Sequence, residues 1–264
     1  MLSSVGNYQM EKVFEALEHG AYDYLNKPKD NQTKIKSIAD SLIQKVKNAA
    51  NADIKTLARG LVKSNQNPHT FNEVRPYDII VIGASTGGPS AVQTVLTRMP
   101  TNLNLPVIIV QHMPQNFIPA FTKRLDVLLH MPVVQVVNNM PVESGKVYVL
   151  STDQNTKLME SKGQIKFIKD RNNYSAYNDP SIDGVMASIN KVFGKRTIGV
   201  LLTGMGKDGA MGMQEIHKTG GLTIAQDEES SVVFGMPKAA ILQGGVSAIM
   251  DVKDISGYIV SSLS

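Results

Sequence analysis

The chain has 264 residues, of which 42% are hydrophobic and 19% are charged, as expected for a globular protein with a substantial core. It contains no cysteine, which excludes disulfides and thiolate metal sites. The net charge is only +4 and the basic residues are scattered, so nucleic acid is not expected as a partner. The N-terminus lacks the features of a signal peptide, and no apolar run approaches the ~18 residues of a membrane helix. We therefore expect a cytoplasmic protein without membrane insertion.

Residues 1–48 form a first block with helical and extended patterns. Residues 9–19 and 31–47 each place apolar side chains on one helical face, and residues 22–28 are typical of a short strand. From residue 49 to residue 76 the periodicity disappears into polar, Asn-rich sequence broken by proline. This second stretch, 49–76, is predicted to be a linker.

The remaining residues, 77–264, alternate between strand and helix patterns and are expected to form a separate domain. The predicted strands are 78–84, 106–111, four short ones within 133–168, 197–202 and 222–226. The predicted helices are 88–98, 117–129, 181–193 (with Ser181 as N-cap) and 208–219. Several strands are continuous apolar runs, which is typical of a parallel sheet covered by helices on both faces. The predicted fold class is therefore α/β.

A glycine-rich turn follows the strand at 78–84, in the stretch VIGASTGGPSA. Its glycines miss the G-x-G-x-x-G spacing, and the lysine of a G-x-x-x-x-G-K-[ST] phosphate loop is absent. The turn does match G-x-S-x-G, with Ser85 between a strand and the start of a helix, where backbone N–H groups suit an oxyanion. An ordinary serine in a glycine turn gives the same letters, so the nucleophile interpretation of Ser85 needs a base and an acid.

Among the five histidines, His112 directly follows a buried strand. Because adjacent parallel strand ends converge on a ligand crevice, we expect Ser85 and His112 to lie close together. Asp208 follows the strand at 197–202 in a second glycine-rich turn, where helix capping alone would also explain it. An α/β-hydrolase would instead need His217 as its base. A general serine esterase of that kind and a non-enzymatic nucleotide- or phosphate-binding module remain as alternatives at this point.

Four ordered motifs, GASTGG, QHMP, LTGMGKDGAMGM and VVFGMP, make residues 77–255 resemble the catalytic domain of chemotaxis protein-glutamate methylesterases. The resemblance implies a doubly wound, mainly parallel sheet. It also implies hydrolysis of glutamate γ-methyl esters on chemoreceptor helices, releasing methanol, and deamidation of receptor glutamines, with neither a cofactor nor a metal. The family's catalytic triad corresponds to Ser85, His112 and Asp208, and the residues near its oxyanion and nucleophile correspond to Thr86 and Met205. One departure is Asp179, where the family commonly has a basic residue before the proline.

The first block resembles the last part of a response-regulator receiver domain, which is flavodoxin-like, with Ser3 and Lys27 matching that family's switch hydroxyl and lysine. The segments carrying the acidic metal pocket and the phosphoacceptor aspartate are missing, so we expect no phosphoacceptor. The implied partners are the methylated cytoplasmic helices of chemoreceptors and a chemotaxis histidine kinase. Such a short, open block buries too little surface to be stable alone. We expect it to dock on the catalytic domain, pair with another chain or be mobile; docked over Ser85, it would inhibit.

Overall fold

The computed structural model places most of residues 77–264 and parts of the first block. It describes residues 2–3, 10–26, 38–39, 42–43, 45–47, 49–50, 77–152, 155–170 and 180–263. Most of the expected linker, most of the expected helix at 31–47, and the residues Lys27 and Asp179 lie outside this part. Within the described residues, no helix is both long and apolar enough to cross a membrane.

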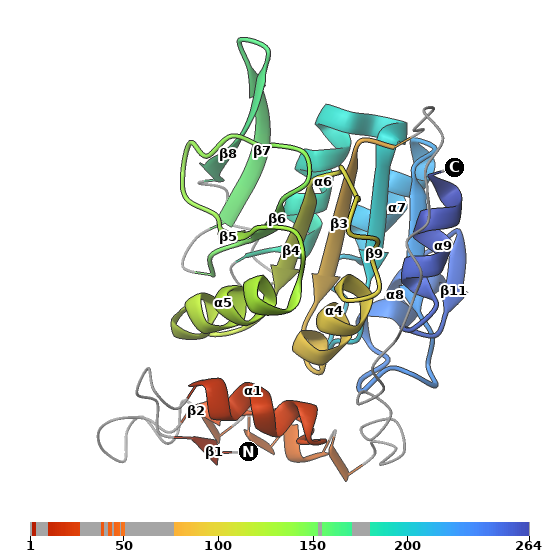
Figure 1. Ribbon diagram of the computed structural model, residues 1–264. Helices are drawn as coiled ribbons and strands as arrows, with labels where there is room; N and C mark the ends of the chain where they lie inside the picture. Colours follow the sequence, from red (N-terminus) through yellow and green to blue (C-terminus); the bar gives the residue numbers. More distant parts are fainter. Residues whose placement is uncertain are drawn as a thin grey trace.

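The centre of the fold is a seven-stranded sheet in which every neighbouring pair is parallel (Figure 1). Its strand order is β11-β10-β9-β3-β4-β6-β5. The strands are β3 (Ile79–Ala84), β4 (Val107–Gln111), β5 (Val133–Gln135), β6 (Val147–Val149), β9 (Thr197–Leu201), β10 (Leu222–Gln226) and β11 (Ala248–Met250). The central strands are buried along their whole length and are apolar apart from the end residues Gln111 and Thr197, because helices cover both faces. The parallel α/β sheet expected from the apolar runs is confirmed.

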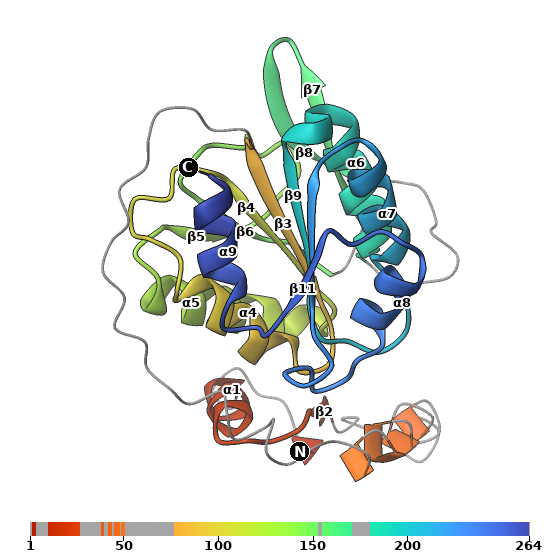
Figure 2. The same cartoon turned by 90° about the vertical axis from the view of Figure 1, so that its right-hand side faces the viewer.

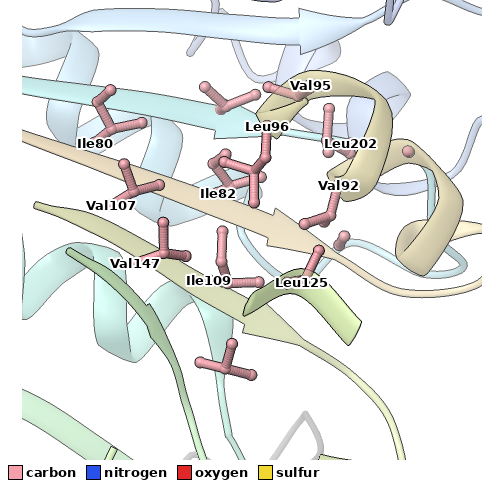
Figure 3. Packing of buried hydrophobic residues seen from close by; sticks show 14 of the residues in the cluster. Ile80, Ile82, Val92, Val95, Leu96, Val107, Ile109, Leu125, Val147 and Leu202 are labelled. Atoms are coloured by element: carbon pink, nitrogen blue, oxygen red, sulfur yellow. The ribbon is translucent and has the colours of Figure 1, made fainter. Parts of the chain in front are cut away.

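Helices cover the two faces of the sheet in two layers (Figure 2). One face carries α4 (Gly88–Leu96), α5 (Ile118–Leu128) and α9 (Ile255–Ser262), and the other carries α6 (Ile182–Phe193), α7 (Ala210–Lys218) and α8 (Met236–Leu242). Side chains alternate along β3: Ile80 and Ile82 enter the core under α4, as Figure 3 shows, while Ile79 and Val81 enter the opposite core. The elements α8, β11 and α9 were not among those predicted from the sequence.

An antiparallel hairpin extends from the body of the fold beside α6 (Figure 1). Its strands are β7 (Asn155–Ser161) and β8 (Gln164–Asp170), within the region where short strands were expected. Leu158 and Phe167 are buried in the core on the α6 face, and the Leu158 N–H donates to the Ser188 hydroxyl at 3.0 Å. The hairpin is thereby anchored at its base while its tip is exposed.

The first block contains a parallel β–α–β arrangement, formed by β1 (Leu2–Ser3), α1 (Met10–Glu18) and β2 (Leu25–Asn26). Figures 1 and 2 show α1 at the end of the sheet toward which the arrow of β3 points, next to α4 and α5. The Phe14 ring stacks on Phe121 with 5.7 Å between centroids, and the Tyr24 ring stacks on Phe117 at 4.4 Å. Of the three arrangements expected for this block, the structure shows docking, on the segment around α4 and α5.

The core under α4 generates a stability prediction. Ile109 is 0% exposed on the central strand β4, whereas Ile249 is 52% exposed on the edge strand β11. Ile109→Ala should lower the free energy of unfolding by about 2–5 kcal/mol, because it leaves a cavity that the surrounding side chains fill only partly. The matched change Ile249→Ala should cost no more than about 0.5 kcal/mol. Chemical denaturation measures both, and equal losses would contradict this assignment of the core.

Candidate active site

Ser85 stands at the carboxyl end of β3, immediately before the turn into α4. Its N–H donates to the Thr203 carbonyl at 3.0 Å, which ties the turn to the end of β9. Among the described residues, the only non-glycine residues with positive φ are Asn139 and Lys162, so Ser85 has an ordinary backbone conformation. The strained elbow that G-x-S-x-G predicts is therefore absent at Ser85, because Gly87, with φ of 75°, makes the left-handed turn into the helix.

His112 lies beside Ser85 because the register of the sheet places it there. Ala84 and Gln111 are the last paired residues of β3 and β4, and the His112 N–H donates to the Ala84 carbonyl at 3.0 Å. Ser85 and His112 are therefore the first residues beyond the same rung of the ladder. Neighbouring strands lie about 4.8 Å apart, so the two side chains start from adjacent backbone positions.

Asp208 reaches His112 from the other side of the Ser85 strand. The distance between His112 Nε2 and Asp208 Oδ2 is 2.9 Å, and both side chains are largely buried. Because β3 lies between β4 and β9, this hydrogen bond passes over the end of the strand that carries Ser85. A neutral imidazole that donates from Nε2 has Nδ1 as its free acceptor. The ring is thus turned the opposite way from the serine-protease arrangement, where Nδ1 faces the carboxylate.

The Asp208 carboxylate is held by the N-terminus of a different helix from the one it precedes. Oδ2 accepts the Ile182 N–H at 2.8 Å, and Oδ1 accepts the Asp183 N–H at 2.9 Å and the Gly209 N–H at 3.0 Å. The Ser181 hydroxyl adds a longer contact of 3.4 Å to Oδ1, and also caps α6 as predicted by accepting the N–H of Gly184. The aligned N–H groups and the helix dipole of α6 stabilise the negative charge of the carboxylate. The alternative explanation for Asp208 was that it caps α7. It does not, because the N-cap residue of α7 is Gly209.

The residues expected near the oxyanion lie on the two turns that flank Ser85. Within the described part of the chain, the Thr86 N–H donates to no protein acceptor, while the Thr86 carbonyl accepts the Thr203 hydroxyl at 3.0 Å. The Thr203 hydroxyl also accepts the Val233 N–H at 2.9 Å, which joins the Thr86 turn to the segment before α8. Met205 lies in the loop between β9 and α7 with 45% of its surface exposed.

The alternative base, His217, is placed elsewhere. It lies in the last turn of α7, and its Nδ1 is 3.2 Å from the Ser247 hydroxyl and 3.4 Å from the Thr223 hydroxyl. Thr223 is near the start of β10, so His217 lies at the amino ends of the parallel strands, whereas Ser85 lies at their carboxyl ends. A general serine esterase that uses His217 is therefore wrong for this chain. Among the described residues, no group of three or more His, Asp or Glu side chains could hold a metal ion.

Sequence reasoning missed the buried polar residues that support the site. Gln111 and Thr203 follow or end otherwise apolar strands and are 1% and 0% exposed. Each hydrogen-bonds to the turn that carries Ser85. The signal was present in the sequence, because a polar residue at the end of a fully buried strand must find a partner. Which partner it finds depends on the neighbouring strand, and the sequence does not show that.

The fold and this set of side chains define the class: an α/β protein of the serine-hydrolase type. The model of the CheB methylesterase family matches residues 80–259, and the chain belongs to that family.

Two curated relatives have sequences similar to this chain over its whole length. A "Protein-glutamate methylesterase/protein-glutamine glutaminase 3" of Syntrophomonas wolfei is 37% identical to this chain. The matched region covers 100% of this chain and 78% of that protein. A protein-glutamate methylesterase/protein-glutamine glutaminase of Pyrococcus abyssi is 34% identical to this chain, and the matched region covers 100% of this chain and 73% of that protein. The crystal structure of the Thermotoga maritima CheB methylesterase catalytic domain superposes with a TM-score of 0.68 at 33% identity, and covers 70% of this chain and 98% of that domain.

A second carboxyl group, Asp183, lies next to Asp208 and takes no part in the contact with His112. Its Oδ1 accepts the Gly212 N–H at 2.8 Å, which joins the first turn of α6 to α7. Burial raises the pKa of Asp183 to about 6, and the charge of Asp208 adds to this, while the Gly212 N–H opposes it. The folded protein therefore holds a proton on Asp183 in a pH range where the unfolded chain, with an ordinary aspartate pKa of about 4, has released it.

This difference predicts how stability depends on pH. The contribution of Asp183 to stability is fully present below about pH 4 and is lost as the pH rises through about 6, because the charged form is disfavoured in the fold. Asp183→Asn stays neutral and keeps a carbonyl oxygen for the Gly212 N–H. The free energy of unfolding of Asp183→Asn minus that of the unchanged protein should therefore be larger at pH 8 than at pH 5.

Urea denaturation at the two pH values measures this difference. Asp251→Asn is the control, since Asp251 also accepts a backbone N–H, from Lys253, at a site away from Asp208. If Asp183→Asn changed the free energy of unfolding by the same amount at pH 5 and pH 8, the raised pKa would be contradicted.

Proposed function

We propose that the chain hydrolyses glutamate γ-methyl esters on chemoreceptors in chemotactic adaptation, with Ser85 as nucleophile, His112 as base and Asp208 as the group that orients His112. The observation that carries this proposal is the 2.9 Å contact between His112 and Asp208, which passes over the end of the Ser85 strand. Family membership supports the choice of substrate, since the similar proteins of Syntrophomonas wolfei and Pyrococcus abyssi carry this activity in their names.

In the acylation step, Ser85 Oγ attacks the ester carbonyl carbon and passes its proton to His112 Nδ1. Asp208 holds Nε2–H and stabilises the imidazolium that forms. The N–H of Thr86, in the turn before α4, donates to the oxyanion, with Met205 on the facing loop supporting the site. His112 then returns the proton to the methoxy oxygen, the C–O bond breaks and methanol leaves, with the glutamyl group esterified to Ser85.

In the deacylation step, His112 removes a proton from water, and the resulting hydroxide attacks the acyl carbon. The tetrahedral adduct collapses, Ser85 Oγ leaves and takes the proton from His112, and the carboxylic acid product loses its own proton to solvent and is released as glutamate carboxylate. A glutamine side chain reacts in the same order, with ammonia in place of methanol. The same site therefore supports receptor glutamine deamidation, the second activity in the names of the similar proteins. Since receptor methylation sites lie on cytoplasmic helices, the proposal places the chain in the cytoplasm.

Three substitutions test the assigned roles. Ser85→Ala and His112→Ala should each lower kcat for methanol release from methylated receptor by on the order of 10⁴-fold or more. Asp208→Asn should reduce kcat less than Ser85→Ala, because Asp208 orients and does not react. Methanol release and circular dichroism are measured on each variant. Hydrolysis near the unchanged rate by folded Ser85→Ala protein would refute the proposal.

The docked first block stands close to this site. Phe14 and Tyr24 both contact Phe117, which is five positions after His112 on the segment leading into α5. Phe14 and Tyr24 are themselves buried in the core that α4 and α5 share with the sheet. This position, beyond the carboxyl ends of the strands, supports an inhibitory role for the block.

Deletion of residues 1–70 tests that role. The truncated protein should hydrolyse methylated receptor faster than the full chain, because the block no longer restricts access to Ser85. The milder variant Phe14→Ala should change the rate in the same direction by weakening the contact with Phe117 and Phe121. Lys12→Ala on the exposed face of α1 is the control. Equal rates for the full chain and the truncated protein would show that the docked block does not inhibit.

A further inference from the structure

The strand β4 is apolar until its last residue, Gln111, which is 1% exposed. The Gln111 side chain lies under the two turns that carry Ser85 and His112. Its Nε2 donates to the Ser85 carbonyl at 2.9 Å and to the His112 carbonyl at 2.9 Å. One amide group thus joins the main chain of the nucleophile to the main chain of the base.

The orientation of this amide follows from its partners. Both partners are carbonyl oxygens, which accept hydrogen bonds, so the amide nitrogen with its two N–H groups must face them. The Ser85 carbonyl also accepts the Gly88 N–H at 2.8 Å, and Gln111 adds a second donor to it. Oε1 then points away from both and, within the described part of the chain, is buried without a hydrogen-bond partner. A buried acceptor without a partner opposes folding. An apolar side chain of similar length would fill the space without this cost, so the two donated hydrogen bonds are what distinguishes glutamine here.

The neighbouring turn leaves room for the amide. A Cβ atom on Gly88 would lie 2.1 Å from Gln111 Oε1 and 2.8 Å from the Cβ atom of Ala84. Only glycine at this position, the first residue of α4, allows Gln111 to extend under the Ser85 turn. The glycine-rich sequence after Ser85 therefore serves this contact as well as the turn.

We propose that Gln111 is a positioning residue that fixes the distance between Ser85 Oγ and the His112 imidazole. The ladder between β3 and β4 ends with the hydrogen bond from the His112 N–H to the Ala84 carbonyl. Beyond that rung the two strands separate into turns, and the Gln111 amide supplies the next connection between them. The inference rests on the proposed roles of Ser85 and His112.

The expected effect is on the rate of reaction and not on substrate binding. Gln111 is buried beneath the turns, so it does not touch the substrate. Without the two hydrogen bonds the turns shift relative to each other, and a displacement of about 1 Å between reacting groups costs on the order of 10²-fold in rate. Gln111→Met, which keeps the length and removes both donors, should lower kcat roughly 10- to 100-fold by the same reasoning, with KM changed less than about twofold.

The test compares Gln111→Met with Gln135→Met. Gln135 also ends a strand of the sheet and donates through its amide, at 2.9 Å to the Ser151 hydroxyl, but it contacts neither Ser85 nor His112. Methanol release from methylated receptor gives kcat and KM, and the rate of covalent modification of Ser85 by a fluorophosphonate reports the reactivity of the nucleophile without the receptor. Both rates should fall in Gln111→Met and stay near the original in Gln135→Met. Rates in Gln111→Met within twofold of the control would overturn the proposal.

A second variant, Gln111→Glu, keeps the shape of the side chain and decides the question if Gln111→Met does not fold. An ionised carboxylate donates no hydrogen bond, whereas a protonated carboxyl donates one. The ratio of its kcat to that of the unchanged protein should therefore fall as the pH rises. A ratio that stays near one at every pH would overturn the inference.

The two proposals fail separately. Continued ester hydrolysis by the Ser85→Ala protein would refute the proposed function. Inactive Ser85→Ala together with fully active Gln111 variants refutes the positioning role alone.

Discussion

The structure depends on one buried carboxylate, that of Asp208. It accepts the first two N–H groups of α6 through Ile182 and Asp183, and it contacts His112 at the end of β4. A single side chain therefore fixes the place of a helix, the end of a strand and the orientation of an imidazole ring. A buried charge is tolerated only where such donors surround it, so the helix N-terminus and the histidine depend on each other through the carboxylate. Removing the carboxylate would therefore leave both the α6 N–H groups and the His112 ring without this partner.

A second set of buried polar groups holds the nucleophile turn from the other directions. Gln111 connects it to β4, and Thr203 connects it to β9 and to the segment around Val233. Ser85 itself needs no strained backbone, because neighbouring carbonyls and N–H groups fix its turn on both sides. This differs from α/β-hydrolases, in which a sharp strained elbow exposes the serine.

The first block shares its core with the catalytic segment. The rings of Phe14, Phe117 and Phe121 pack together, and Phe117 also stacks on Tyr24. A short β–α–β unit buries little surface alone, and this packing supplies the apolar contacts that it lacks. Because Phe117 follows His112 by five positions, the first block packs directly against the segment that carries the proposed base.

Local periodicity was enough to find most strands and helices and to rank Ser85, His112 and Asp208 as candidates. Apolar runs report burial on both faces, and glycine-rich turns report where strands end. The short elements α8, β11 and α9 were missed, since their patterns are brief and their partners are distant in the chain. What only the tertiary structure decided was strand order. Placing β3 between β4 and β9 lets Asp208 reach His112 across Ser85 and puts the Gln111 amide between two carbonyls. Strand order results from packing between residues far apart in sequence, which no local pattern records.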